Sequence, residues 1–482
     1  MHVAVVFRVL GILLTLFSGT MLVPFLVALL YDDGAQYAFL TAFAITLCTG
    51  LACWLPVRNR IGDMGIRDGF LITVSFWLVL GLYGALPLMI ADEPHLSPVD
   101  AVFESLSGLT TTGATVIQGL DNLPESILFY RQQLQWLGGM GIIVLALAVL
   151  PMLGVGGMQL FRAETSGPVK DSKITPRIAE TAKALWYIYM GLTVACAMAY
   201  WLAGMDAFDA IAHSFSTVSI GGFSTHDASI GFFDNFAIEL IAVFFIVVSG
   251  ISFTLHFYFL RRPTPRSYLD NIECRTYLSI LLVVSLVAWC VLYIQGDYGL
   301  AGALRYGLFA TVSIATTTGF ATTDYSVWAS FLPFLLFFCS FAGGCAGSTG
   351  GGIKVIRLIL ILKQGHLEIK RLIHPNAVIP IKINDQPVPD RVMEAVWGFF
   401  SVYILVFSLI FVAVLATGLD LLTAFSAVAA CINNLGPGLG QVALHYGDIN
   451  QLSKWILCFA MLIGRLEIFT LLVLFSPTFW RN

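Results

Sequence analysis

Apolar residues are gathered along this chain into long blocks that carry few or no charges. A helix needs roughly 20 residues to cross the bilayer's hydrocarbon core of about 30 Å. Ten segments meet this requirement, at residues 9–30, 37–57, 69–91, 127–152, 184–204, 236–260, 277–295, 331–362, 392–417 and 451–477. The pattern predicts an all-α integral membrane protein with ten transmembrane helices, of which only the eighth is interrupted.

The overall composition and the placement of charge support this prediction. Only 11% of the residues are charged, against about a quarter in soluble domains. With the N-terminus inside, all but four of the 25 Lys and Arg residues fall in the inner connections or at the two ends. The exceptions are Arg131, Arg305, Lys454 and Arg465. Because positive residues concentrate on the cytoplasmic side, both termini are predicted to be cytoplasmic. The span 127–152 is the least regular, since Arg131 and three glutamines lie in its outer turns.

Four segments between spans are too apolar for ordinary loops and too short to cross a membrane, at residues 97–117, 206–227, 303–324 and 419–440. They align on Gly113, Gly222, Gly319 and Gly436, and six residues earlier stand Ser107, Ser216, Ser313 and Ala430. Repetition at a near-constant period indicates copies of one structural unit. We therefore predict a helix pair (1–62) followed by four helix–loop–helix units (63–168, 169–268, 269–375 and 376–482). The units should surround one central pore with pseudo-fourfold symmetry.

Each of these segments begins like a short helix that enters the membrane and turns back. Ser97 followed by Pro98 and Asp100 has the pattern of a capping box, and Asp206 and Asp420 can cap two of the others. Irregular backbone at membrane depth is tolerated only where protein shields it or water faces it. Four such segments therefore imply a shared aqueous lumen.

The glycine in each segment suits a cation filter built from backbone carbonyls. Such carbonyls replace the hydration shell of the ion, and glycine adopts the required backbone angles without a Cβ penalty. We assign the filter to Thr110, Thr111, Thr112, Gly113, Ile220, Gly221, Gly222, Thr317, Thr318, Gly319, Asn434, Leu435 and Gly436. We expect K⁺ at Thr111, Thr112, Ile220, Gly221, Thr317, Thr318, Asn434 and Leu435. The competing interpretation is that glycines only allow close helix packing, and it applies most to Gly221.

The eighth span contains FAGGCAGSTGGGIKVIR at 341–357, whose glycines cannot hold a regular helix. A P-loop is not satisfied, because Ile353 precedes Lys354 and no Ser or Thr follows it. A membrane serine protease would need a base beside Ser348, and no His is evidently placed for it. We predict a gate inside the pore, formed by Gly343, Gly344, Gly347, Gly350, Gly351 and Gly352.

Arg465 lies near the middle of the last span, where an ionisable residue is a functional candidate. It either forms a barrier to cations and holds the glycine loop closed, or makes a structural pair with Glu467 or with backbone carbonyls.

The motifs SGLTTTGAT, IGGFSTHDASIG, TTTGF, GGCAGSTGGGIKVIR, HPNAV and NNLGPGLG resemble the TrkH members of the Trk/Ktr/HKT cation-transporter superfamily. The resemblance implies uptake of K⁺ and Rb⁺ across a bacterial inner membrane, with the four glycines in the filter. It also implies that 343–352 form the gate, that Arg465 is its barrier residue, and that the protein is a homodimer with one pore per protomer. A cytoplasmic TrkA-type ring that binds nucleotides would regulate transport, while this chain carries no nucleotide site of its own.

Relatives that pass Na⁺ often carry Ser at the first filter glycine, so Gly113 favours K⁺. A Na⁺/K⁺-permeable transporter stays open as the alternative, as does coupling to H⁺. An enzyme is not expected, because the sequence offers no nucleophile–base pair. A secondary transporter of an organic solute would usually show inverted or twofold repeats. No cofactor and no nucleic acid is expected.

Overall fold

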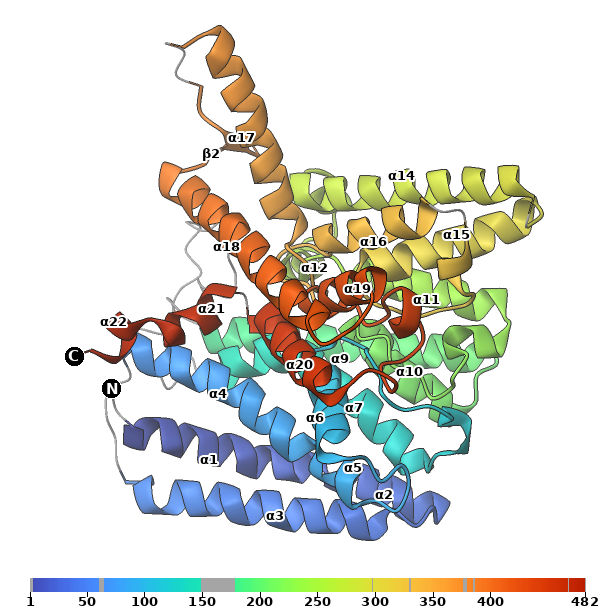
Figure 1. Cartoon of the computed structure of the whole chain (residues 1–482), viewed down its shortest axis with the longest axis vertical. Helices are drawn as coiled ribbons and strands as arrows, with labels where there is room; N and C mark the ends of the chain where they lie inside the picture. Colours follow the sequence, from blue (N-terminus) through green and yellow to red (C-terminus); the bar gives the residue numbers. More distant parts are fainter. Residues whose placement is uncertain are drawn as a thin grey trace.

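The computed structural model describes residues 3–59, 65–148, 178–296, 298–328, 331–375, 379–384, 386–466 and 468–481. Within these ranges the chain is mostly helical, and the two strands β1 (Lys382–Ile383) and β2 (Gln386–Pro387) form a single antiparallel pair. Helices α1 (Val3–Thr20) and α2 (Leu22–Tyr31) run nearly end to end and pack beside α3 (Gln36–Trp54). Figure 1 shows these helices side by side at the foot of the molecule, next to α4 (Ile66–Gly84).

The remaining elements follow the order of the four predicted units. The first has α4, α5 (Leu86–Ile90), α6 (Pro98–Leu109), η2 (Leu120–Asn122) and α7 (Glu125–Ala148). The second has α9 (Ile178–Leu202), α10 (Ala207–Ser219), η4 (Ser229–Phe233), α11 (Phe236–Ser249), α12 (Phe253–Arg261) and α13 (Arg266–Leu269). The third has α14 (Ile272–Gln295), α15 (Leu300–Ala315), η5 (Tyr325–Val327), α16 (Leu332–Ala342) and α17 (Val355–Ile373). The fourth has α18 (Asp390–Leu415), α19 (Leu421–Ile432), η6 (Gly440–Val442), α20 (Gln451–Leu466), α21 (Ile468–Leu472), η7 (Val473–Phe475) and α22 (Pro477–Trp480).

Six helical stretches of the described chain are long and apolar enough to cross a membrane, and two bent helix pairs raise the number to eight. This confirms an integral membrane protein. The count of ten stays a prediction, because the span 127–152 runs beyond the described residues and the eighth predicted span is a short helix, a loop and α17.

Two spans predicted to be continuous are broken. In 236–260 the chain bends by 91° between α11 and α12, and in 451–477 it bends by 114° after α20. The first break has a visible cause, since backbone groups there bond to the glycine loop instead of to their own helix. The Gly250 carbonyl accepts from the Cys345 amide (2.9 Å), and the Phe253 amide donates to the Gly347 carbonyl (3.0 Å). Helices kink where an outside group takes over their backbone bonds.

The four short helices form the centre of the molecule. In α6 every residue from Ala101 to Leu109 is buried, whereas only 22–56% of each candidate span is buried. A helix too short to span would leave irregular backbone in lipid unless protein covered it. The long helices supply that cover, and their exposed Leu, Phe and Val side chains suit contact with lipid.

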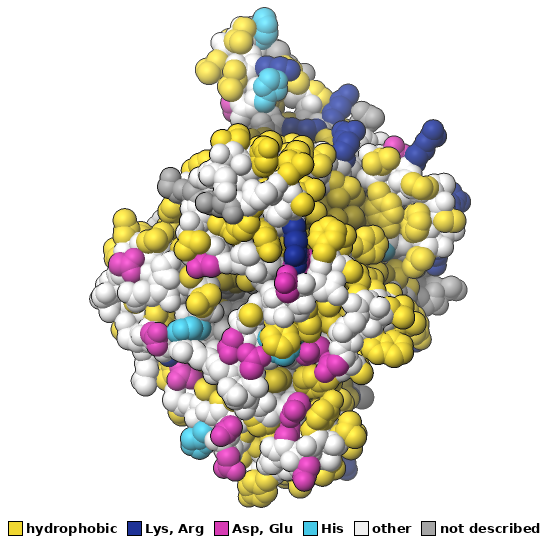
Figure 2. All heavy atoms as spheres, turned by 90° about the vertical axis from the view of Figure 1, so that its right-hand side faces the viewer, with side chains coloured by type: hydrophobic (Ala, Val, Ile, Leu, Met, Phe, Trp, Pro, Cys, Tyr) yellow, Lys and Arg dark blue, Asp and Glu magenta, His cyan; other side chains and the backbone are white. Residues whose placement is uncertain are grey.

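One end of the bundle has an acidic surface. The termini lie on the side opposite to the connection between α14 and α15 (Figure 1). Figure 2 shows the face on the side of that connection, where Asp and Glu side chains are spread over much of the surface and Lys and Arg are gathered mainly at one edge.

Candidate ion pathway

The short helices begin with the caps that the sequence predicts in three of the four units. The side chains of Ser97, Asp206 and Asp420 accept hydrogen bonds from the backbone amides three residues on. The third helix starts earlier than predicted, after Gly299, and has no side-chain cap. An N-cap of this kind is worth about 1 kcal/mol, which helps to fix where each helix starts.

All four helices end in the same unusual backbone shape. Two residues before each aligned glycine, a residue other than glycine has positive φ: Thr111 (54°), Ile220 (55°), Thr317 (70°) and Asn434 (54°). The glycines also have positive φ, at 80° for Gly113, 80° for Gly222, 85° for Gly319 and 95° for Gly436. Positive φ is costly for a residue with a Cβ, and such strain tends to persist only where the surroundings enforce it.

One hydrogen bond closes each bend, and it is the same bond in all four. The amide just before the glycine donates to the carbonyl five residues earlier, at 2.8 Å each time: Thr112 to Ser107, Gly221 to Ser216, Thr318 to Ser313 and Leu435 to Ala430. This is the longer bond of a Schellman-type helix end. The aligned Ser and Ala positions therefore share a backbone role, which explains why Ala430 can stand where the other units have Ser.

The four bends meet one another in cyclic order. Gly113 lies against the carbonyl oxygen of Gly221, Gly222 against that of Thr318, Gly319 against that of Leu435, and Gly436 against that of Thr112. A Cβ added to any of these glycines would collide with the neighbouring oxygen. The structure thus brings all four predicted glycines together, each packed on the next loop, with the fourth closing onto the first. We call this arrangement the glycine ring.

Two pairs of threonine hydroxyls, one in the first bend and one in the third, bond to each other. Thr110 Oγ1 is 2.8 Å from Thr112 Oγ1, and Thr316 Oγ1 is 2.8 Å from Thr318 Oγ1. These hydrogen bonds tie the two hydroxyls of each pair together within one bend. In the fourth unit Asn434 takes a related position, since its Nδ2 donates to Thr112 Oγ1 (2.9 Å). The Gly221 carbonyl differs from its counterparts, because it accepts a hydrogen bond from Gln135 Nε2 (2.6 Å).

The glycine-rich loop between α16 and α17 lies against the inner ends of three short helices. The Gly351 amide donates to Thr317 Oγ1 (2.8 Å) and the Gly352 amide to the Asn433 carbonyl (3.1 Å). Thr349 Oγ1 donates to the carbonyl of Val218 (3.0 Å), on α10. These bonds put the predicted gate residues directly beside the predicted filter loops.

Arg465 joins the glycine-rich loop to helix α7. It donates from Nη1 to the Thr349 carbonyl (3.1 Å) and from Nη2 to the Gly138 carbonyl on α7 (2.8 Å). Of the partners that the sequence suggested, backbone carbonyls are therefore present, while Glu467 lies outside the described residues.

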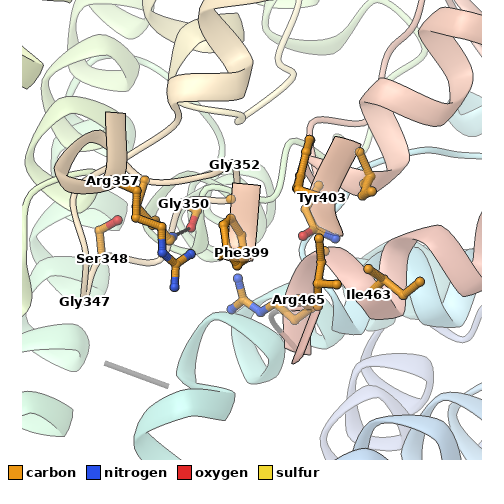
Figure 3. Close-up of a pocket in the computed structure, with 15 residues that line it drawn as sticks. Gly347, Ser348, Gly350, Gly352, Arg357, Phe399, Tyr403, Ile463 and Arg465 are labelled. Carbon is orange, nitrogen blue, oxygen red and sulfur yellow. Dashed lines mark hydrogen bonds between the residues drawn. The ribbon is translucent and has the colours of Figure 1, made fainter. Parts of the chain in front are cut away.

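A cavity of about 60 Å³ lies between the glycine loop and Arg465, and Asn434 and Tyr403 also line it. Figure 3 shows that the guanidinium groups of Arg357 and Arg465 reach into the same space from different elements. Arg357 stacks over the Phe399 ring (4.0 Å to its centre), and Lys354 Nζ bonds to the Gly350 carbonyl. Neither Lys354 nor Arg357 was among the predicted gate residues, although their place right after the glycine run was a usable signal.

A helical membrane chain in which four re-entrant helices meet in one glycine ring has the architecture of an ion-translocating protein. Among the described residues, no group of three or more His, Cys, Asp and Glu side chains could hold a metal ion. The comparisons with known proteins define the class more closely.

The family model of TrkH, a cation transport protein, matches residues 35–482. The chain is 59% identical to the "Trk system potassium uptake protein TrkH" of Vibrio parahaemolyticus, over 99% of both chains. It is 55% identical to the protein of that name from Escherichia coli K12, over the full length of both, and 45% identical to TrkG of the same strain, over 100% of this chain and 99% of that one. The crystal structure of the potassium transporter TrkH from Vibrio parahaemolyticus superimposes with a TM-score of 0.92, at 57% identity and full coverage of both chains. The chain belongs to the TrkH family of cation transport proteins, which confirms the predicted family and is not a family of enzymes.

Proposed function

We propose that this chain is the ion-translocating subunit of a bacterial K⁺ uptake system and moves K⁺ and Rb⁺ inward across the inner membrane. Support comes from relatives that are potassium uptake proteins by name and align over the whole chain. The single observation that carries the mechanism is the glycine ring. A bare cation in hydrocarbon costs tens of kcal/mol, and carbonyl oxygens held on one axis offset that cost.

In this proposal the filter consists of the four bends around the pore. The carbonyls of Thr111, Thr112, Ile220, Gly221, Thr317, Thr318, Asn434 and Leu435 hold K⁺, and the four units have pseudo-fourfold symmetry. Shared backbone angles and the four identical closing bonds support this arrangement. The inner ends of the short helices carry partial negative charge, which favours a cation in the space below.

The gate in this proposal is the glycine loop with Arg465. Its position against three of the short helices supports the assignment. The charges of Lys354, Arg357 and Arg465 around the cavity oppose the passage of a cation while the loop stays in place. Shortening the loop within 343–352 should raise the flux of cations.

The assembly in this proposal is a homodimer with one pore per protomer, with both termini in the cytoplasm and a TrkA-type nucleotide-binding subunit on that side. The membrane potential supplies about 2.3 kcal/mol per charge for each 100 mV, which drives K⁺ inward without a second ion.

The test is uptake of radioactive Rb⁺ by liposomes that contain the purified full-length chain. Uptake should depend on the membrane potential, should be reduced by K⁺ in competition and should be largely insensitive to Na⁺. Absence of uptake, or equal competition by Na⁺, contradicts K⁺ selectivity, and the second result favours a Na⁺/K⁺-permeable transporter. Varying the pH on the two sides reveals any coupling to H⁺.

A further inference from the structure

Helix α7, which begins the irregular predicted span 127–152, carries several buried polar residues, and two of them contact the filter loops. Arg131 and Gln135 stand four residues apart, so they lie on the same face of the helix, and both are almost fully buried. A charged residue inside a membrane span is expected to have partners and a function. Both side chains reach toward the first and second filter loops.

Arg131 connects the two loops through a buried ion pair. Its Nε bonds to Glu104 Oε1 on α6 (2.8 Å), and both side chains are 1% exposed. Its Nη2 donates to Thr115 Oγ1 (3.1 Å), and its Nη1 donates to the Ser224 carbonyl (3.0 Å). Thr115 and Ser224 each follow a ring glycine by two residues, so one guanidinium holds the segments that leave both loops.

Glu104 completes this contact from the other side. Its Oε2 accepts from the Val116 amide (2.9 Å), and its two oxygens accept from Thr115 Oγ1 (3.0 and 3.1 Å). Bonds to charged groups are stronger than neutral ones, and low polarity around them strengthens them further. The segment after Gly113 is therefore held through both its backbone and a side chain.

Gln135 holds the ring itself. Its Nε2 donates to the Gly221 carbonyl (2.6 Å) and its Oε1 accepts from the Phe223 amide (3.0 Å). These two bonds fix the backbone on both sides of Gly222. The oxygen held in this way is the one against which Gly113 packs. Among the described residues, no hydrogen bond reaches the matching carbonyls of Thr112, Thr318 and Leu435.

We propose that Arg131 and Gln135 are positioning residues that set the K⁺/Na⁺ selectivity of the filter by fixing the contact between the first and second loops. This inference rests on the proposed function. Na⁺ is smaller than K⁺, so a filter binds it well only if its carbonyls can move inward or turn. The Gly221 oxygen moves less because it is bonded to the side-chain amide of Gln135, which is buried on α7. The ion pair between Arg131 and Glu104 keeps the first and second loops at a fixed distance.

The decisive variant is Gln135→Met, which keeps the length of the side chain and removes both hydrogen bonds. The matched control is Gln133→Met on the same helix, because Gln133 Nε2 donates to the Thr20 carbonyl on α1 (2.8 Å) and not to a filter loop. The full-length proteins are reconstituted in liposomes, and the fluxes of Rb⁺ and of radioactive Na⁺ are measured side by side.

We expect Gln135→Met to lower the ratio of Rb⁺ to Na⁺ flux about fivefold, the effect of about one hydrogen bond. The Gln133→Met protein should keep the wild-type ratio. Arg131→Lys is the second variant, and it decides the question if Gln135→Met does not purify as a single species. It keeps the charge beside Glu104, but a single ammonium nitrogen cannot reach Glu104, Thr115 and Ser224 together as the three guanidinium nitrogens do, so it should also lower the ratio.

Wild-type ratios in both Gln135→Met and Arg131→Lys overturn the inference while leaving the proposed function intact. An equal drop in Gln133→Met also overturns it, because the effect would then belong to the packing of α7 in general. A wild-type protein that carries neither ion contradicts the proposed function itself, and it does so before any variant is compared.

Discussion

The glycine ring and the loop between α16 and α17 are both rich in glycine, but different contacts hold them in place. Each bend of the ring is closed by a backbone bond within its own unit, repeated four times at the same length. The loop also has backbone bonds of its own, such as the Val355 amide to the Gly344 carbonyl (3.2 Å), but its attachment to the filter loops and to α7 depends on Thr317, the Asn433 and Val218 carbonyls, and Arg465. The closing bond sets the local shape of each bend, while Arg131 and Gln135 set how the first two bends lie against each other. A structure held by distant side chains can be released, which is what a gate requires.

The largest effect should come from the ring. Gly222→Ala places a Cβ at φ 80° against the Thr318 oxygen, so the loop must move or the ring must open. We expect selective Rb⁺ flux to fall at least about a hundredfold, the equivalent of about 2.7 kcal/mol. Gly191→Ala on α9 is the control, since a Cβ there meets nothing within 4 Å. Near-normal selective flux in Gly222→Ala would show that the ring is not the filter.

A second change in the same ring is Gly113→Ser. The added Cβ meets the Gly221 oxygen much as one at Gly222 meets that of Thr318, but relatives that pass Na⁺ often carry Ser at this position, so we expect a lower ratio of K⁺ to Na⁺ flux with transport retained. An unchanged ratio, measured in the same liposomes, would separate Gly113 from selectivity.

On the loop side of the comparison, Arg465→Ala removes two charged hydrogen bonds and one positive charge. Such bonds contribute about 1.5–3 kcal/mol each, so flux should rise by about tenfold or more. Arg465→Lys separates the charge of the residue from its two hydrogen bonds, because lysine keeps the positive charge but lacks the forked guanidinium group that reaches both carbonyls. Low flux in the Lys variant indicates a charge barrier, and high flux indicates a latch. Unchanged flux in Arg465→Ala protein that is well folded argues for a structural role only.

A smaller effect is expected at Thr349. Its hydroxyl donates to the Val218 carbonyl, and Thr349→Val removes that bond at nearly constant volume. Loss of about 1 kcal/mol should raise flux about fivefold. Ser348→Ala is the neighbouring control, because the Ser348 hydroxyl has no hydrogen bond among the described residues. Equal fluxes in the two variants would mean that the Thr349 bond does not hold the loop.

The smallest effect concerns pH at the outer end of the second loop. Burial opposes charge on His226, but hydrogen bonds to Asp209 (3.0 Å) and Asp121 (2.5 Å) outweigh it and raise its pKa above the usual 6.5. Its contribution to stability is therefore complete below about pH 6.5 and is lost as the pH rises through the raised pKa.

We expect the free energy of unfolding to fall by less than about 1 kcal/mol over that interval. The measurement is thermal unfolding in detergent across the pH range. His226→Gln should remove this step and Asp121→Asn should reduce it. A step of full size in His226→Gln would assign it to another group. The flux of an Arg465→Ala protein should show no matching step, since the loop is held by other contacts.

Much of the site could be predicted from the sequence, because its key features are local. The four glycines, the caps at Ser97, Asp206 and Asp420, and the ends of the short helices follow from residue type and spacing. The glycine run could be recognised as a break in a helix for the same reason.

The rest depends on contacts between units. The order in which the bends touch is set by helix packing, and the break after α11 arises because the glycine loop takes its backbone bonds. The position of Arg131 in an apolar span indicates that it has polar partners. It does not indicate that these partners come from two different loops.

Closure of the ring by Gly436 against Thr112 has a consequence for how the protein is made. The fourth bend, at Gly436, is translated after more than four hundred residues have been synthesised. The first three bends are therefore in place before the ring can close. A chain that stops before the fourth unit would contain most of the helices and no complete passage. Damage near the C-terminal end should therefore be as harmful as damage to the first unit.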